Sequence, residues 1–137
     1  MFLVDSNVLL DIVKQQEPFA AGSSQALEDA LMLGAVQINP VIYAEVSIAY
    51  ATAAELDRVL TRLGIGRHDL AWEGAHLAGQ AFLRYRRQGG IKTAPLPDFY
   101  IGADAMVSGL TLITRDARRY QTYFPQLKLI VPDGVAP

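Results

Sequence analysis

The sequence predicts an α/β fold in which helices cover both faces of a central parallel sheet. Short apolar runs alternate along the chain with segments of helical periodicity, which is typical of parallel α/β proteins. The runs show no alternation of apolar and polar residues, as expected for strands buried on both faces. With 51% hydrophobic and 19% charged residues, the chain of 137 residues can build one core. We therefore expect a single domain over residues 1–137, with the last few residues loosely held.

Start and stop signals assign the elements in order. The predicted strands are residues 2–4, 36–38, 65–70, 110–114 and 127–131, the third being the weakest. The predicted helices are residues 7–13, 24–33, 41–50, 53–63, 71–88 and 99–108, and the longer loops are 15–22 and 91–97. Asn39-Pro40 opens the third helix, because proline is tolerated in a first turn. Thr52 and Glu55 form a capping box before the fourth helix, which Gly64 ends.

Composition excludes several classes of protein. The formal net charge is −2, from 12 basic and 14 acidic residues, whereas nucleic-acid binders are usually basic. If four of the acidic residues were metal ligands, the charge of the remaining residues would be positive. The net charge therefore neither supports nor excludes nucleic-acid binding. The absence of cysteine excludes disulfides and thiolate zinc sites and agrees with a cytoplasmic location. No apolar run reaches the ~18 residues of a membrane helix, and the first residues do not resemble a secretion signal.

Four acidic residues are expected where parallel sheets bind their ligands. Asp5 directly follows the first strand, and Asp116 follows the fourth by two residues. Asp98 is placed as the N-cap of the helix that leads into the fourth strand. Ligands bind beyond the carboxyl ends of the strands where strand order reverses, so Asp5 and Asp116 should meet if their strands are neighbours. Glu45 lies in the helix after the second strand, from which a longer side chain is needed.

Glu45 also requires a partner, because the residues three and four positions away are apolar. Several carboxylates in one cleft repel one another, and burial raises the cost of their charges. A divalent cation removes both penalties, and carboxylates with water suit Mg²⁺ or Mn²⁺ better than zinc. Such an ion can activate water for attack on a phosphodiester. The sequence therefore predicts a metal-binding catalytic site formed by Asp5, Glu45, Asp98 and Asp116.

Four segments, in this order and at these separations, resemble a PIN domain: VDSNVLLD, PVIYAEV, PDFYIGADA and LITRDARRY. The small size and the ending FPQLKLIVP resemble the VapC-type toxin ribonucleases of bacterial toxin–antitoxin pairs. The resemblance implies a three-layer α/β/α fold with about five short parallel strands, Mg²⁺- or Mn²⁺-dependent RNA cleavage, a homodimer and a cognate antitoxin. Carried over residue by residue, it gives the same four acids, with Ser6, Asn7 and Thr114 as polar helpers.

Each acid also has a purely structural interpretation. Asp5 and Asp98 could only cap helices, Glu45 could belong to a buried ion pair, and Asp116 could only shape a turn. Asp116 is the least secure of the four, because the fourth acid varies most among the relatives that the resemblance suggests.

Other residues are expected to lie outside the site. Asp11 and Asp104 are interpreted as solvated or partner-facing, since Asp104 lies about 240° around its helix from the third acid. His68 and His76 lack a third partner at ligand spacing and are interpreted as ordinary surface or core residues. Trp72 is expected in the core or in a dimer contact, as is Phe82.

Basic and aromatic residues supply candidates for RNA contact. Phosphate contact gives affinity without sequence choice, although arginines also solvate helix ends. Tyr85, Tyr100 and Tyr120 could stack on bases or pack in the core. The candidate RNA-binding residues are Arg84, Arg86, Arg87, Lys92, Arg115, Arg118 and Arg119.

The hypothesis is a nuclease that cleaves single-stranded or looped RNA. Because the acids have no basic partner adjacent in sequence, we expect an antitoxin to place an arginine or lysine among them. A phosphoryl-transfer or receiver module is disfavoured, since no Asp-x-Asp follows the first strand and Lys128 lies inside a strand. A catalytically silent binding module is disfavoured by the presence of all four acids.

Overall fold

The computed structural model describes residues 1–92 and 96–134. Within these ranges one all-parallel sheet has the strand order β3-β2-β1-β4-β5. Its strands are β1 (Phe2–Val4), β2 (Val36–Ile38), β3 (Gly66–Arg67), β4 (Thr111–Ile113) and β5 (Leu129–Ile130). The helices are α1 (Ser6–Val13), α2 (Ala20–Leu33), α3 (Pro40–Ser47), α4 (Ala53–Leu63), α5 (Trp72–Arg87), α6 (Pro97–Ser108) and α7 (Ala117–Tyr123).

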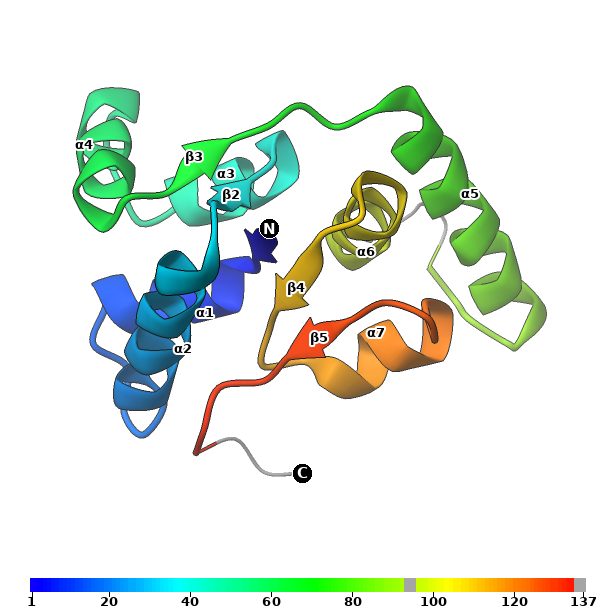
Figure 1. Ribbon diagram of the computed structural model, residues 1–137. Helices are drawn as coiled ribbons and strands as arrows, with labels where there is room; N and C mark the ends of the chain where they lie inside the picture. The colour runs from blue at the N-terminus through cyan, green and yellow to red at the C-terminus, as the bar shows by residue number, and fades with distance from the viewer. Residues whose placement is uncertain (93–95, 135–137) are drawn as a thin grey trace.

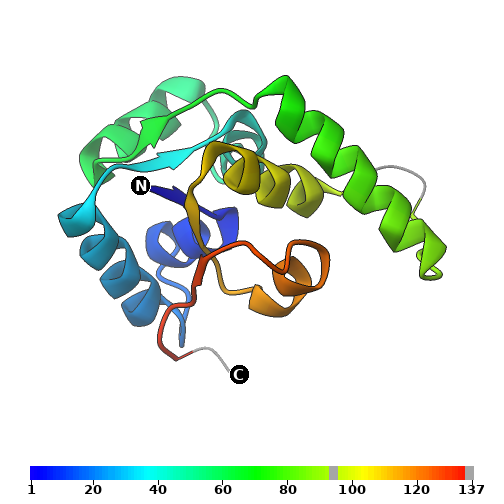
Figure 2. The same cartoon turned by 45° about the vertical axis from the view of Figure 1, so that its right-hand side comes forward.

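The helices form two groups. Helices α1 to α4 connect β1, β2 and β3, which follow one another toward one edge of the sheet, and α5 to α7 connect the strands that run toward the other edge. Crossovers between parallel strands are right-handed, so connections in opposite directions place their helices on opposite faces. Figures 1 and 2 show α5, α6 and α7 gathered together, and all three contact one another. The predicted three-layer α/β/α architecture is confirmed.

The strand order reverses next to β1. Leu3 of β1 is in register with Gln37 of β2 on one side and with Leu112 of β4 on the other. Asp5, which follows β1, is therefore next to the residues that follow β4. The sequence-based condition that these two strands be neighbours is met.

Several predicted boundaries are wrong. Helix α2 begins at Ala20, within the predicted loop, and α3 ends at Ser47 rather than at residue 50. Helix α6 begins at Pro97, with Leu96 at the N-cap, so Asp98 lies in the first turn and is not the N-cap. This shift follows from proline, whose fixed φ favours the first helical position. Helix α7 was not predicted at all.

The predicted ends of α4 are confirmed, and the predictions of core residues are confirmed in part. Thr52 caps α4 by accepting a hydrogen bond from the backbone N–H of Glu55 at 3.2 Å, and Gly64 ends that helix with a φ of 77°. Phe82 packs against the core, whereas Trp72 is 91% exposed, so its core interpretation is wrong. The largest fully buried side chains include Leu3, Leu9, Ile38, Ile42, Leu56, Ile101, Leu112, Ile113 and Tyr120.

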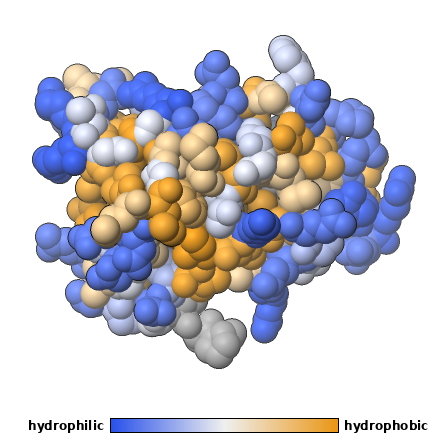
Figure 3. All heavy atoms as spheres, in the orientation of Figure 1, coloured by the Kyte–Doolittle hydropathy of each residue, from blue (hydrophilic) through white to orange (hydrophobic). Residues whose placement is uncertain are grey.

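The molecular surface is polar at its rim. In the space-filling view, hydrophilic side chains gather around the outline while hydrophobic atoms lie mainly in the middle (Figure 3). No helix in the described part of the chain is long and apolar enough to cross a membrane. The predicted loose tail and the predicted loop 91–97 fall partly on residues 135–137 and 93–95, which lie outside the described residues.

Candidate active site

Asp5 is buried at the carboxyl end of β1 and is only 2% exposed. It is the N-cap of α1, and its Oδ1 accepts a hydrogen bond from the backbone N–H of Ser6 at 2.8 Å. Its Oδ2 accepts hydrogen bonds from Thr114 Oγ1 at 2.8 Å and from the Tyr120 hydroxyl at 3.0 Å. Asp5 therefore caps α1 and also belongs to the group of acids at this edge of the sheet.

The hydroxyl of Tyr120 joins Asp5 to Asp98. It lies 3.0 Å from Asp5 Oδ2 and 3.2 Å from Asp98 Oδ1, and the ring is 1% exposed. A phenol has one proton, so it can donate to only one of the two carboxylates at a time. The second carboxylate then needs a proton of its own or a cation.

Glu45 reaches the same place from α3. The hydroxyl of Ser6 donates a hydrogen bond to its Oε1 at 2.9 Å, and Ser6 also contacts Asp5 through its backbone. Glu45 is half-buried. Three of the four predicted acids are therefore connected: Asp5 to Glu45 through Ser6, and Asp5 to Asp98 through a tyrosine.

Asp5, Glu45 and Asp98 together form the acid cluster. This cluster is short of positive charge at its buried end, where Asp5 lies. The pKa of Asp5 is raised to about 6: burial is the largest cause, the charge of Asp98 also raises it, and the hydrogen bonds from Thr114, the tyrosine and Ser6 oppose the rise. Burial, together with the charge of Asp98, also raises the pKa of Glu45. The pKa of Tyr120 is raised by burial and by the charges of Asp5 and Asp98. A cation at this end would favour the ionised carboxylates.

Asp116 lies apart from the buried acids. Its backbone N–H donates to Thr114 Oγ1 at 3.0 Å, but its side chain is 43% exposed. Arg119 forms a hydrogen-bonded ion pair with Asp98 and places its Nε 3.6 Å from Asp116 Oδ2. Although no basic partner adjacent in sequence was expected, Arg119 supplies an internal one through the fold.

The polar helpers lie beside the acids as the sequence suggested. Asn7 Nδ2 is 3.5 Å from both Asp5 Oδ2 and Thr114 Oγ1. Asn7 Oδ1 accepts the backbone N–H of Arg115 at 3.2 Å, which ties the loop after β4 to α1. With Ser6 and Thr114, this amide holds the carboxylate of Asp5 in place.

The donor set suits a hard divalent cation, because it consists of carboxylate and hydroxyl oxygens. The side chains are nevertheless not arranged as a coordination shell. Among residues 1–92 and 96–134, no three acidic or histidine side chains are close enough together to hold a metal ion. The Tyr120 hydroxyl and the Arg119 guanidinium stand between acids that a shared ion would contact.

The candidate RNA-binding residues fall into two places. Arg84, Arg86 and Arg87 lie in the last turn of α5, where Arg84 donates to the carbonyl of Tyr123 at 3.0 Å. Lys92 follows that helix. Of the other three, Arg115 lies in the segment between β4 and α7, and Arg118 and Arg119 lie in α7.

Arg115 is largely committed to a structural contact. Its Nε lies 2.7 Å from Asp11 Oδ2 and its Nη2 lies 3.1 Å from Asp11 Oδ1, and the guanidinium stacks 4.0 Å from the ring centre of Phe19. Ser23 also donates to Asp11, at 2.9 Å. Asp11 is 2% exposed, so the interpretation of this residue as solvated is wrong.

Asp104 was likewise expected in solvent or at a partner, and it is 0% exposed. Its Oδ2 lies 2.7 Å from His68 Nε2, so His68 has a specific charged partner. The helical geometry correctly separated Asp104 from Asp98, but the face it occupies is covered by α5.

Sequence reasoning named Tyr120 and Arg119 only as candidates for RNA contact and missed both as partners of the acids. Both belong to α7, which was not predicted. A signal was present, since Tyr120, Tyr123 and Phe124 recur at spacings of three and four after Asp116, as on one face of a helix.

The comparison with protein families decides the kinship of the chain. A model of the PIN domain matches residues 2–125. The chain belongs to the PIN domain family. PIN domains are in general nucleases and typically bind divalent metal ions. No curated protein sequence is similar enough to match this PIN domain.

Solved structures of toxin–antitoxin systems share its fold. VapBC2 from Rickettsia felis, bound to a DNA fragment from the promoter, superposes with a TM-score of 0.72 at 18% identity, over 96% of this chain and 98% of that one. A toxin–antitoxin complex from Klebsiella pneumoniae gives 0.66 at 22% identity, over 95% and 96%. FitAcB from Neisseria gonorrhoeae gives 0.65 at 21% identity, over 95% and 96%.

Proposed function

We propose that this PIN domain is a metal-dependent endoribonuclease and the toxin of a VapC-type toxin–antitoxin pair. The observation that carries the proposal is the connection of Asp5, Glu45 and Asp98 at the carboxyl edge of the sheet through Ser6 and Tyr120. Carboxylates held this close, with one of them buried, favour a bound cation. The reversal of strand order at this edge is where parallel sheets place their ligands.

Asp5, Glu45 and Asp98 would hold Mg²⁺ or Mn²⁺, with Asp116 at the outer side. When bound, such an ion would supply Lewis-acid activation of water and neutralisation of phosphodiester charge. Thr114 and Ser6 fix the orientation of the carboxylates by hydrogen bonds. Arg119 already pairs with Asp98, so a cation on that carboxylate would compete with the guanidinium or share the carboxylate with it.

The candidate RNA-binding residues, which are the arginines and the lysine named in the sequence analysis, would contact the phosphates of single-stranded or looped RNA outside the acid cluster. Exposed Arg118 and Arg87 are the most available of them. Their contribution would be to affinity rather than to sequence choice.

The proposal of an antitoxin partner rests on the toxin–antitoxin complexes that share this fold. An antitoxin side chain at the acids would have to compete with Arg119, which already contacts Asp98 and Asp116. A homodimer and a cytoplasmic location are proposed on the same kinship.

The test is cleavage of a panel of tRNAs and structured RNAs with Mg²⁺, Mn²⁺ or EDTA. Asp98→Asn should lower the rate by at least roughly 100-fold, because a ligand is lost. Asp29→Asn is the matched control, since Asp29 is an exposed acid on α2. Cleavage that survives EDTA, or that Asp98→Asn leaves unchanged, would contradict the proposal.

A catalytically silent binding module is the second candidate, because the acids are not arranged as a coordination shell in the described residues. It predicts no cleavage of any RNA in the panel and no binding of Mn²⁺ by calorimetry. Metal binding that Asp98→Asn abolishes would exclude it.

A further inference from the structure

Asp104 is a fully buried carboxylate in the interior of α6, with 0% of its surface exposed. Its Oδ2 accepts a hydrogen bond from Asn39 Nδ2 at 2.8 Å and lies 2.7 Å from His68 Nε2. Its Oδ1 accepts a hydrogen bond from Ser108 Oγ at 3.2 Å. A buried charge is tolerated only when its partners are complete, so this group of four, the Asp104 cluster, is expected to be rigid.

Asn39 connects this cluster to the start of α3. It is the N-cap of α3, and its Oδ1 accepts the backbone N–H of Ile42 at 3.0 Å while its Nδ2 donates to Asp104. Within the described residues, this is the only side-chain hydrogen bond between α3 with its cap and α6. One amide therefore links two helices that each carry an acid of the candidate site.

The two acids lie at equal sequence distance from this link. Glu45 follows Asn39 by six residues on α3, and Asp98 precedes Asp104 by six residues on α6. The helices also contact each other directly. Because helices are stiff over such lengths, a shift at the link changes the separation of Glu45 and Asp98.

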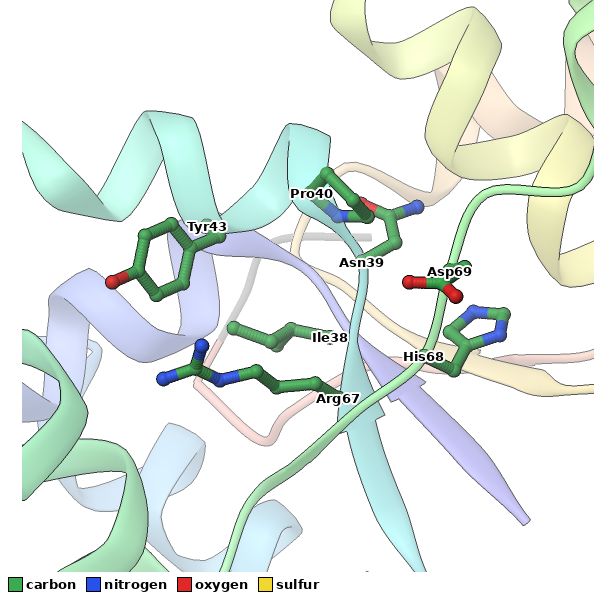
Figure 4. Close-up of a pocket in the computed structure, with 7 residues that line it drawn as sticks. All are labelled: Ile38, Asn39, Pro40, Tyr43, Arg67, His68 and Asp69. Atoms are coloured by element: carbon green, nitrogen blue, oxygen red, sulfur yellow. The ribbon is translucent and has the colours of Figure 1, made fainter.

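His68 and α5 fix the cluster from its other sides. The backbone N–H of His68 donates to the carbonyl of Ile38 at 3.0 Å, which holds the segment after β3 against β2. A hollow of about 280 Å³ opens here, and Figure 4 shows Asn39 and His68 together on one side of it. A Cβ on Gly74 would stand 3.4 Å from Asp104 Cα, so α5 closely approaches α6 at this residue.

We propose that Asn39, His68 and Asp104 are positioning residues that set the separation of Glu45 and Asp98, and thereby the affinity of the acid cluster for a divalent cation. The proposal rests on the function proposed above. The three residues touch neither the reacting atoms nor the ion. They act through the placement of α3 against α6.

Asn39→Ser isolates the link with the least damage to the fold. Serine caps a helix about as well as asparagine, so α3 keeps its N-cap, but the hydroxyl is too short to reach Asp104. Asp104 retains His68 and Ser108. The Kd for Mn²⁺, measured by calorimetry, should rise about tenfold or more, the usual effect of losing a group that orients metal ligands.

Two substitutions at Asp104 separate hydrogen bonding from charge. Asp104→Asn can preserve the contacts with Asn39, His68 and Ser108, because its amide oxygen accepts and its NH₂ donates to the serine hydroxyl. It should keep the Kd within about threefold of the wild type, whereas Asp104→Leu, similar in size, should weaken binding as much as Asn39→Ser does. Combining Asn39→Ser with Asp104→Leu should add little, since both cut the same link.

Leu27→Ala on α2 is the control for a merely structural role. Leu27 is 4% exposed in the core, and α2 makes no substantial contact with α3 or α6 among the described residues. This variant should lose stability in urea while the Kd for Mn²⁺ stays unchanged.

The outcomes distinguish the two proposals. A wild type that binds Mn²⁺, together with Asn39→Ser and Asp104→Leu variants that bind it equally well, overturns the positioning role and leaves the proposed nuclease intact. An Asp104→Asn variant as weak as Asp104→Leu overturns the hydrogen-bonded link as the cause. A wild type that binds no divalent cation overturns the proposed function and the positioning role with it.

Discussion

Mild acid should stabilise the metal-free protein, and Asp5 should be the main cause. Burial raises the pKa of Asp5 from 3.8 to about 6 in the folded chain. Between about pH 4 and pH 6 the folded state then binds more protons than the unfolded state, so the free energy of unfolding falls as the pH rises. Above about pH 6 the Asp5 contribution is constant. A difference of about two pH units at 1.36 kcal/mol each gives about 3 kcal/mol.

The assay is urea unfolding in EDTA at pH values from 4 to 7.5, for the wild type and Asp5→Asn. The asparagine does not titrate, so the difference between the two proteins isolates Asp5. Glu45, whose pKa burial also raises, contributes to both proteins and cancels. The stability of Asp5→Asn relative to the wild type should increase by about 3 kcal/mol between pH 4 and pH 7.

Saturating Mg²⁺ gives the complementary measurement. A cation bound to Asp5 keeps the carboxylate ionised. With the ion present, the free energy of unfolding of the wild type should therefore no longer fall as the pH rises. A difference between wild type and Asp5→Asn that stays constant from pH 4 to pH 7 in EDTA would refute the reasoning about burial.

Two further predictions concern packing rather than ionisation. Arg115→Ala leaves the buried carboxylate of Asp11 without its cation and should cost about 3 kcal/mol of unfolding free energy, whereas Arg118→Ala on the surface should cost little; equal urea midpoints for the two variants would contradict the buried-pair assignment. Gly102→Ala places a Cβ 2.4 Å from the ring of Phe124 and should cost about 1–3 kcal/mol through overpacking; an unchanged melting temperature would show that this ring moves freely.

The fold was predictable because its main signals are local. The strand Phe2–Val4 is wholly apolar, and caps such as Thr52 and Gly64 mark helix ends independently of tertiary structure. Helix α7 was not predicted because it has only seven residues, two of them arginine. It is stabilised by the burial of the Tyr120 side chain. A helix that short receives its stability from packing rather than from propensity.

The proximity of Asp5, Glu45 and Asp98 was predictable from the sequence, whereas the side chains that contact these acids were not. The acids follow strands or lie on the next helix, so topology alone brings Asp5 and Asp98 to one edge. The contacts of Arg119 depend on how α7 packs on α6, and those of Asp104 on how the start of α3 and the segment after β3 meet α6, which no local spacing encodes. Helical geometry gave the correct face for Asp104 and the wrong environment, because only the tertiary structure shows which faces are covered.

The central place of β1 has a consequence for synthesis of the protein. Strand β1 is synthesised first, yet it pairs with β4. Asp5 accepts hydrogen bonds from Thr114 and Tyr120, which follow it in the chain by 109 and 115 residues. A nascent chain that has exposed only its first hundred residues therefore lacks both the neighbour of β1 and the hydroxyls that hold Asp5. The contacts that hold Asp5 therefore form only after the segment that carries Thr114 and Tyr120 has also left the ribosome.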